Sequence, residues 1–153
     1  MIKQNSPVKI AFFHIMAANF SGAAKNIFRL LNKIDIKKLD PILIGQTENE
    51  LTKKVRKLNL KVSIIEYPRA LNIYDKKLLN INLLGYIKIF SALWEYNTLL
   101  IKYFRLVKPQ IIWADNIRTF FFIFIASKLC RCKIIWNIWS EPTGKIAWFL
   151  HHV

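Results

Sequence analysis

The sequence predicts an α/β domain with a Rossmann-like, doubly wound parallel sheet, and three observations support this prediction. The chain has 153 residues, the size of a single domain, and 54% of them are hydrophobic, which is enough for a buried core. Five short apolar runs alternate with segments of helical periodicity. The segments between the runs are roughly ten residues or longer, as crossovers between parallel strands require.

The five expected strands are short apolar runs of the kind that is buried on both faces of a parallel sheet. They are Val8–Ile15, Asp40–Gly45, Lys61–Tyr67, Gln110–Ala114 and Lys133–Trp139. No internal repeat or disordered linker interrupts this alternation, so we expect one sheet in a single domain spanning residues 1–153.

Four helices are expected between these strands. They are Ala23–Lys33, Glu48–Leu58, Leu79–Val107 and Ile117–Leu129. The longest carries an apolar seam of Leu83, Ile87, Phe90, Trp94, Leu100 or Ile101, and Phe104. Gly85 weakens this helix, so two shorter helices are the alternative, and Pro109 ends it. The last helix is apolar nearly all round, which indicates burial.

The charge of the chain is strongly one-sided. It has 24 Lys and Arg against 9 Asp and Glu, a net charge of +15. Solvated helix faces explain part of this excess, but its size also indicates an anionic partner. Lys25, Arg29, Lys33 and Lys37 recur every four residues and form a basic stripe, which is our candidate contact with an anionic membrane surface. Nucleic acid is not expected as a partner, because the sequence has no RNP, KH or helix-turn-helix signature.

The cysteines exclude two kinds of site. Cys130 and Cys132 are one residue apart, which suits neither a disulfide nor, without a second pair, a zinc site. We expect two reduced thiols in a cytoplasmic protein and no metal. Neither a dinucleotide-binding glycine motif nor a P-loop is present, so no cofactor is expected.

Ligands of doubly wound sheets bind beyond the carboxyl ends of the strands. Here this edge is formed by the loops 16–22, 46–48, 115–118 and 140–144. Asp115 and Glu141 are the carboxylates at strand ends, and we expect them to orient an acceptor hydroxyl or to act as general base. The alternatives are that Asp115 caps the following helix and that Glu141 is a solvated loop residue.

Several other residues at this edge are candidates for binding an acceptor or a phosphate. Arg118 is positioned to pair with Asp115 or with a ligand phosphate, and Trp139 to stack on a sugar ring. Gly22 opens a helix whose N-terminus suits an anion, although an ordinary turn capped by Ser21 is the alternative. His14, on a strand, is expected to be a satisfied core histidine, with a contact in the cleft as the alternative. The full set is Phe20, Ser21, Gly22, Lys25, Asn116, Arg118 and Trp139.

Three segments in register resemble the N-terminal domain of glycosyltransferase family 4, which has the GT-B fold. They are VKIAFFHI…SGAAKNIFRLLN…DPILIG at the start, KPQIIWADN at residues 108–116, and Cys132–Ser140. The Gly-Gly-Ala-Glu-Arg-like loop of the family becomes Ser21-Gly22-Ala23-Ala24-Lys25, which lacks the carboxylate but keeps a basic residue. The positions of the family's histidines carry Trp113, Asp115 and Trp139.

The resemblance implies the acceptor-side half of a transferase. The family's second domain, which binds the nucleotide-sugar, has no counterpart in this sequence. We therefore expect an acceptor-binding domain that is inactive alone, either a fragment or one subunit of a split enzyme with a separate donor-binding subunit. The nucleotide-sugar is then a co-substrate. The resemblance also implies a sugar, lipid-linked or polysaccharide acceptor and a peripheral position on the cytoplasmic membrane face. The alternatives are a non-catalytic basic module on membranes or anionic polymers, and a GT-B-like reaction such as nucleotide-sugar epimerisation.

Overall fold

A computed structural model describes residues 6–15, 20, 22–71 and 82–137 of the chain. The elements alternate as the sequence predicts. They are β1 (Val8–His14), α1 (Gly22–Asn32), β2 (Leu39–Gly45), α2 (Glu50–Lys57), β3 (Lys61–Ile64), the short 3-10 turn η1 (Arg69–Leu71), α3 (Leu83–Val107), β4 (Ile111–Ala114), α4 (Ile117–Leu129) and β5 (Lys133–Trp136).

The five strands form one parallel sheet in the order β3-β2-β1-β4-β5. Strand β1 is central and pairs with β2 on one side and β4 on the other, so that Phe12 is opposite both Leu43 and Trp113. The chain builds one half of the sheet outward from β1 and then crosses back through α3 to begin the other half at β4. The boundary between β1 and β4 is therefore the topological switch point. This order and the parallel pairing confirm the predicted fold class.

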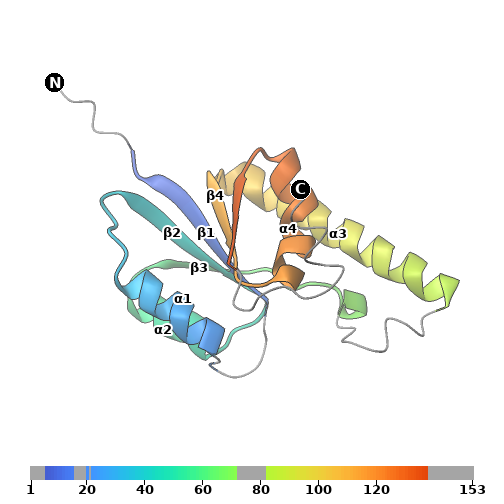
Figure 1. Ribbon diagram of the computed structural model, residues 1–153, viewed down its shortest axis with the longest axis horizontal. Helices are drawn as coiled ribbons and strands as arrows, with labels where there is room; N and C mark the ends of the chain where they lie inside the picture. Colours follow the sequence, from blue (N-terminus) through green and yellow to red (C-terminus); the bar gives the residue numbers. More distant parts are fainter. Residues whose placement is uncertain (1–5, 16–19, 21, 72–81, 138–153) are drawn as a thin grey trace.

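The sheet separates two cores, because successive strand residues point to opposite faces (Figure 1). Ile10 and Phe12 of β1 pack with α1 and α2, in a cluster that includes Ile27 and Val55. Ala11 and Phe13 pack on the other face, in the cluster formed with α3 and α4. Both faces of β1 are thus covered, which explains why its sequence is a continuous apolar run.

Two strands end earlier than the apolar runs predict. Strand β3 ends at Ile64 rather than at Tyr67. It pairs only with β2 at the edge of the sheet, and Tyr67 instead packs edge-on against Tyr96 and Phe122, with ring centroids 6.0 and 5.6 Å away. Strand β5 ends at Trp136 rather than at Trp139, and residues 138 and 139 lie outside the described residues.

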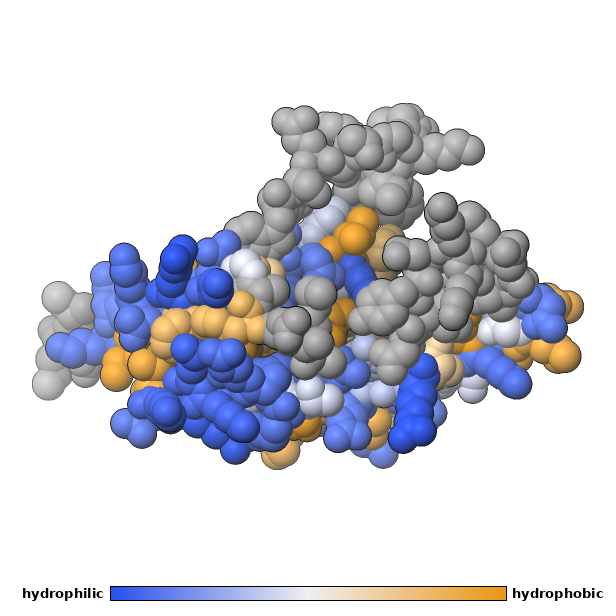
Figure 2. All heavy atoms as spheres, turned by 90° about the horizontal axis from the view of Figure 1, so that it is seen from below, coloured by the Kyte–Doolittle hydropathy of each residue, from blue (hydrophilic) through white to orange (hydrophobic). Residues whose placement is uncertain are grey.

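The apolar seam of α3 is buried only in its second half, at Leu100 and Phe104. Leu83, Ile87, Phe90 and Trp94 are 55–76% exposed, and the buried residues are Ala92, Tyr96, Asn97, Leu100 and Phe104. The helix extends past the sheet at its N-terminal end, where Figure 1 shows no strand beside it and Figure 2 shows hydrophobic residues at the surface. Gly85 does not divide the helix, because it lies in the first turn, where its N–H bonds to the Asn82 side chain at 2.9 Å.

Helix α4 is only partly buried, although its apolar sequence predicts burial on all sides. Phe121 and Leu129 are 50% and 61% exposed, whereas Thr119, Ile123, Ala126 and Ser127 are buried. The helix covers one edge of a two-sided sheet, so a single stripe is enough to fill that space. None of the described helices is both long enough and apolar enough to span a membrane.

The two cysteines are free thiols, as predicted. Cys132 is buried directly before β5, and burial raises the pKa of its thiol to about 11. The thiol is therefore protonated at neutral pH and is a poor nucleophile.

A buried asparagine joins α3 to α4. The Asn97 side chain donates to the backbone oxygen of Leu93 within α3 and accepts the backbone N–H of Ala126 in α4, both at 2.9 Å. Asn97 is 1% exposed, so both bonds are shielded from water. This side chain therefore fixes the position of one helix along the other.

Asn97→Ala should lower the free energy of unfolding by about 1–3 kcal/mol, because it leaves buried polar groups without their partner. The matched change is Thr98→Ala, whose hydroxyl bonds to the Trp94 oxygen on the exposed side of the same helix. We expect this control to cost about 0.5 kcal/mol or less. Urea denaturation measures both, and equal losses would contradict the role assigned to Asn97.

Candidate functional site

Polar side chains gather where β1, β2 and β4 end. His14 is the last residue of β1 and is paired in the sheet with Gly45, the last residue of β2. Asp115 follows Ala114, the last residue of β4, which is opposite Phe13. His14 and Asp115 are thus neighbours at the switch point of the sheet, the position where doubly wound folds bind their ligands.

His14 and Asp115 form a buried hydrogen-bonded pair. The distance from His14 Nδ1 to Asp115 Oδ2 is 2.5 Å, and the two residues are 2% and 0% exposed. The other carboxylate oxygen accepts the Thr119 hydroxyl at 2.6 Å and the Asn116 side-chain amide at 2.8 Å. Three donors therefore hold this carboxylate in one orientation.

The hydrogen bond to Asp115 determines which nitrogen of the His14 ring carries the proton. A carboxylate that accepts two other donors favours a proton on His14 Nδ1, which is then donated to Asp115. In that tautomer Nε2 is the ring nitrogen that can accept a proton. An aspartate that orients a histidine in this way is the arrangement used by general-base histidines.

Asn116, and not Asp115, caps helix α4. Its side-chain oxygen accepts the backbone N–H of Thr119 at 2.9 Å, and its backbone is extended. The alternative that Asp115 is the N-cap is therefore wrong. Because the neighbouring asparagine satisfies the helix end, the Asp115 carboxylate is available to bond His14.

The end of β2 is tightly packed beside this pair. A Cβ atom added at Gly45 would lie 3.2 Å from Thr52 Cγ2, so glycine allows α2 to approach the strand closely. The next residue, Gln46, is 8% exposed, and within the described residues its side-chain oxygen has no hydrogen-bond partner. This edge of the sheet therefore offers a buried hydrogen-bond acceptor, the Gln46 side-chain oxygen, directly after β2, the strand that pairs with β1.

The first loop contributes three described candidates. Phe20 packs edge-on against Phe28, with centroids 6.1 Å apart, and the Lys54 ammonium lies 4.7 Å from its ring centroid. Gly22 is the first residue of α1, with open space around the position of a Cβ atom. Lys25 is exposed on the first turns of that helix. Phe20 is therefore part of the packing between α1 and α2, and Gly22 and Lys25 are accessible.

Arg118 is packed into the structure between α4 and the turn after β3. Its guanidinium lies 5.3 Å from the Phe122 ring centroid and 5.9 Å from that of Tyr67, and it donates to the backbone oxygen of Leu71. These contacts join α4 to η1. A role in binding phosphate stays a prediction. Ser21, Trp139 and Glu141 lie outside the described residues.

The basic stripe is not a continuous helix face. Helix α1 ends at Asn32, so Lys25 and Arg29 are on the helix, whereas Lys33 and Lys37 lie in the turns after it. The Lys33 N–H bonds to the Leu30 oxygen at 3.1 Å, which tightens the chain at the helix end. All four side chains are exposed, and hydrophilic residues cover much of the face formed by α1 and α2 (Figure 2).

The sequence pattern does not identify His14 as the main candidate for the site. Its place in an apolar run favours a core histidine, and the ring is indeed buried. The sequence carries no signal for its role, because Ile15 continues the apolar run after His14. In the structure His14 ends β1 and Asp115 directly follows β4. Only the order of the strands makes these two strand ends neighbours.

The fold of the chain is similar to that of solved glycosyltransferases. A glycosyltransferase from Rickettsia africae matches at 14% identity and a TM-score of 0.62, over 94% of this chain and 33% of that one. MurG from Acinetobacter baumannii matches at 11% identity and a TM-score of 0.61, over 96% of this chain and 39% of that one. The chain thus spans about a third of the length of these enzymes.

The same fold also occurs outside glycosyltransferases. The C-terminal domain of a hydrogenase from Pyrococcus furiosus matches at 10% identity and a TM-score of 0.57, over 90% of this chain and 96% of that domain. Comparison with protein-family models finds no match, and comparison with curated proteins finds no significant one. The chain therefore has a glycosyltransferase-like fold, and its function must be argued from its own residues.

Thr119→Val should destabilise the domain by about 1–3 kcal/mol, because the buried Asp115 carboxylate loses one of its donors while the side-chain volume is kept. Thr98→Val makes the same change at an exposed helix position and should cost about 0.5 kcal/mol or less. Thermal and urea unfolding measure the difference. A Thr119→Val protein as stable as the control would show that the hydroxyl does not support the pair.

Proposed function

We propose that this chain is the acceptor-binding domain of a glycosyltransferase, in which His14 is the general base and Asp115 orients it. The single observation that supports this most is the buried His14–Asp115 hydrogen bond at the switch point of the sheet. In the proposed reaction, His14 Nε2 accepts the proton of the acceptor hydroxyl as that oxygen attacks the sugar carbon of a nucleotide-sugar. The bond between this carbon and the diphosphate oxygen breaks, and the nucleoside diphosphate leaves with the bonding electrons.

The arrangement supports this chemistry in two ways. Asp115 is held by Thr119 and Asn116, so it can stabilise the imidazolium that forms when His14 takes the proton. The loop between β1 and α1 and the start of α4 both begin at this edge, so an acceptor at the edge would contact Asn116 and the first turn of α1. Gly22 and Lys25 are exposed there for a sugar or a phosphate-bearing acceptor.

Transfer requires a donor-binding partner in this proposal. The solved glycosyltransferases are about three times as long as the part that this chain matches. The donor nucleotide-sugar would be held by a second domain or subunit facing the carboxyl edge of the sheet. On this reading the domain supplies the base and the acceptor site, and the partner supplies the donor site.

A peripheral contact with an anionic membrane is the second candidate function. Lys25 and Arg29 are exposed on α1, and exposed apolar residues lie close to them in sequence, with Leu30 41% and Ile36 64% exposed. Basic side chains with nearby apolar residues suit the surface of an anionic bilayer. In a transferase this contact would bring a lipid-linked acceptor to the site.

Titration of the isotope-labelled chain with glucose, galactose, N-acetylglucosamine and their octyl glycosides tests the acceptor site. At least one sugar should shift the backbone amide signals of His14, Gly45 and Asn116. His14→Gln should weaken its binding about tenfold, the effect of losing one hydrogen bond to a buried polar group. Glu95→Gln, at an exposed position on α3, is the matched control.

Two results would contradict the proposal. Signal shifts confined to residues away from the carboxyl edge of the sheet would place the ligand elsewhere. Sugar transfer by the isolated chain from a nucleotide-sugar would show that no donor-binding partner is needed.

Flotation with vesicles tests the membrane contact. The chain should bind phosphatidylcholine vesicles that contain phosphatidylglycerol, and the double change Lys25→Gln and Arg29→Gln should reduce binding roughly tenfold or more, at about 1 kcal/mol for each basic residue. Lys53→Gln with Lys57→Gln removes the same charge from α2. Equal loss in the two double variants, or equal binding to neutral vesicles, would exclude a specific contact through α1.

A further inference from the structure

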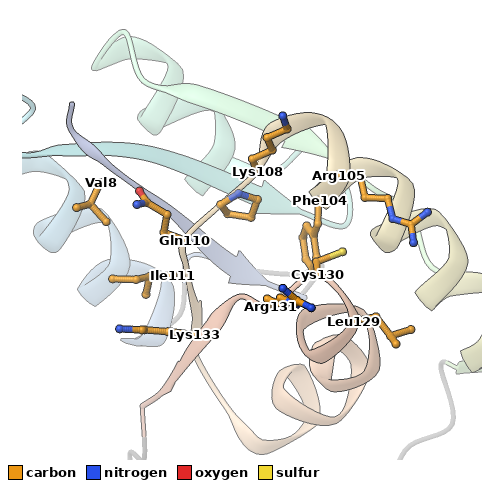
Figure 3. Close-up of a pocket in the computed structure, with 11 residues that line it drawn as sticks. Val8, Phe104, Arg105, Lys108, Gln110, Ile111, Leu129, Cys130, Arg131 and Lys133 are labelled. Carbon is orange, nitrogen blue, oxygen red and sulfur yellow. The ribbon is translucent and has the colours of Figure 1, made fainter. Parts of the chain in front are cut away.

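A hollow of about 760 Å³ lies at the opposite end of the sheet from His14 and Asp115. Its walls are the first residues of β1, β4 and β5 and the last turns of α3 and α4 (Figure 3). It is lined by Val8, Phe104, Arg105, Lys108, Pro109, Gln110, Ile111, Leu129, Cys130, Arg131 and Lys133. The sheet separates it from the candidate acceptor site, so the two cannot share a ligand.

Four cations line this hollow. Arg105 and Lys108 come from the end of α3, Arg131 follows α4, and Lys133 begins β5. Figure 3 shows Arg131 among the labelled side chains, with Lys133 on one side of it and Arg105 on the other. Among the described residues, no acidic side chain lines the hollow and none of the four cations forms a salt bridge. Their positive charge is therefore not neutralised locally.

The backbone gives a second reason to single out two of these residues. Lys108 and Arg131 have left-handed backbone conformations, with φ of 55° and 57°. Glycine is the usual residue at such positions after a helix, and a side chain there costs about 1 kcal/mol. The attraction of a cation to a helix C-terminus is about 0.3–1 kcal/mol, so it does no more than offset that cost. Local structure therefore gives Lys and Arg no net advantage over glycine at these two positions, whereas binding of an anionic ligand would favour the two cations.

The floor of the hollow is apolar. Phe104 is 1% exposed beneath it, and Pro109 and Ile111 form the adjacent wall. At its rim Leu129 is 61% exposed. Cations around an apolar floor, with a leucine at the rim, match a ligand that has an anionic head and an apolar body.

We infer that this hollow binds a phosphate-bearing amphiphile, with Arg131 on the phosphate and Phe104, Ile111 and Leu129 on the apolar part. The guanidinium of Arg131 suits two phosphate oxygens at once, and Lys108 adds positive charge at the edge of the hollow. The phosphate comes either from a soluble alkyl phosphate or from the head group of a membrane lipid. This site does not depend on the proposed transferase activity.

Calorimetric titration of the full 153-residue chain with hexyl phosphate, inorganic phosphate and hexanol tests the soluble source. Hexyl phosphate should bind at least tenfold more tightly than either of the other two. Arg131→Gly should weaken its binding about tenfold, the effect of losing a charge-assisted hydrogen bond. Glycine suits the positive φ, so this variant should fold at least as stably as the parent chain. Lys53→Gln, exposed on α2, should leave binding unchanged.

Flotation with phosphatidylcholine vesicles containing phosphatidic acid tests the membrane source, with Lys108→Gly and Arg131→Gly compared with Lys53→Gln. Loss of binding in the glycine variants, but not in the control, supports the inference. Loss of hexyl phosphate binding identifies the soluble source, and loss of vesicle binding identifies the membrane source. Absence of binding to both probes, or equal loss in Lys53→Gln, overturns it. His14→Gln should leave this binding unchanged, which distinguishes the hollow from the acceptor site.

Discussion

The central position of β1 is the constraint on which the rest of the structure depends. This strand is paired on both edges and packed on both faces, so its alternate residues fill two separate cores. Its last residue, His14, therefore cannot turn to solvent and must find a partner inside the protein. Asp115 is that partner because β4 is the strand next to β1. The geometry of the candidate site thus follows from the topology of the sheet.

The two ends of the sheet have different chemistry because all of its strands are parallel. At the carboxyl end, helices begin, and the residues that satisfy their first turns are polar caps such as Asn116 and Asn49. At the amino end, helices finish, and the last turns carry cations such as Arg105. A buried acid–base pair therefore occupies one end, and an excess of positive charge surrounds a hollow at the other.

The packing of α3 shows where apolar patterns mislead. Its seam of large residues predicts a buried face, and Leu100 and Phe104 are buried, yet Leu83, Ile87, Phe90 and Trp94 are exposed. Helix periodicity defines a stripe but not the surface that the stripe contacts, and the first turns of this helix extend past the sheet. The face that is buried holds smaller and polar residues as well, among them Ala92 and Asn97, because α4 approaches there and Asn97 bonds to its backbone.

Sequence patterns alone predict the α/β class, the order of strands and helices along the chain, the free thiols and the loop that carries Asp115. These features depend on local periodicity, proline positions and residue type, which a sequence displays directly. Only the folded chain shows that His14 is bonded to Asp115, that Asn116 is the cap, that the basic stripe breaks after Arg29, and that Lys108 and Arg131 line one hollow. Each of these depends on which strand ends and helix ends become neighbours, and the order of strands in the sheet is a property of the folded chain.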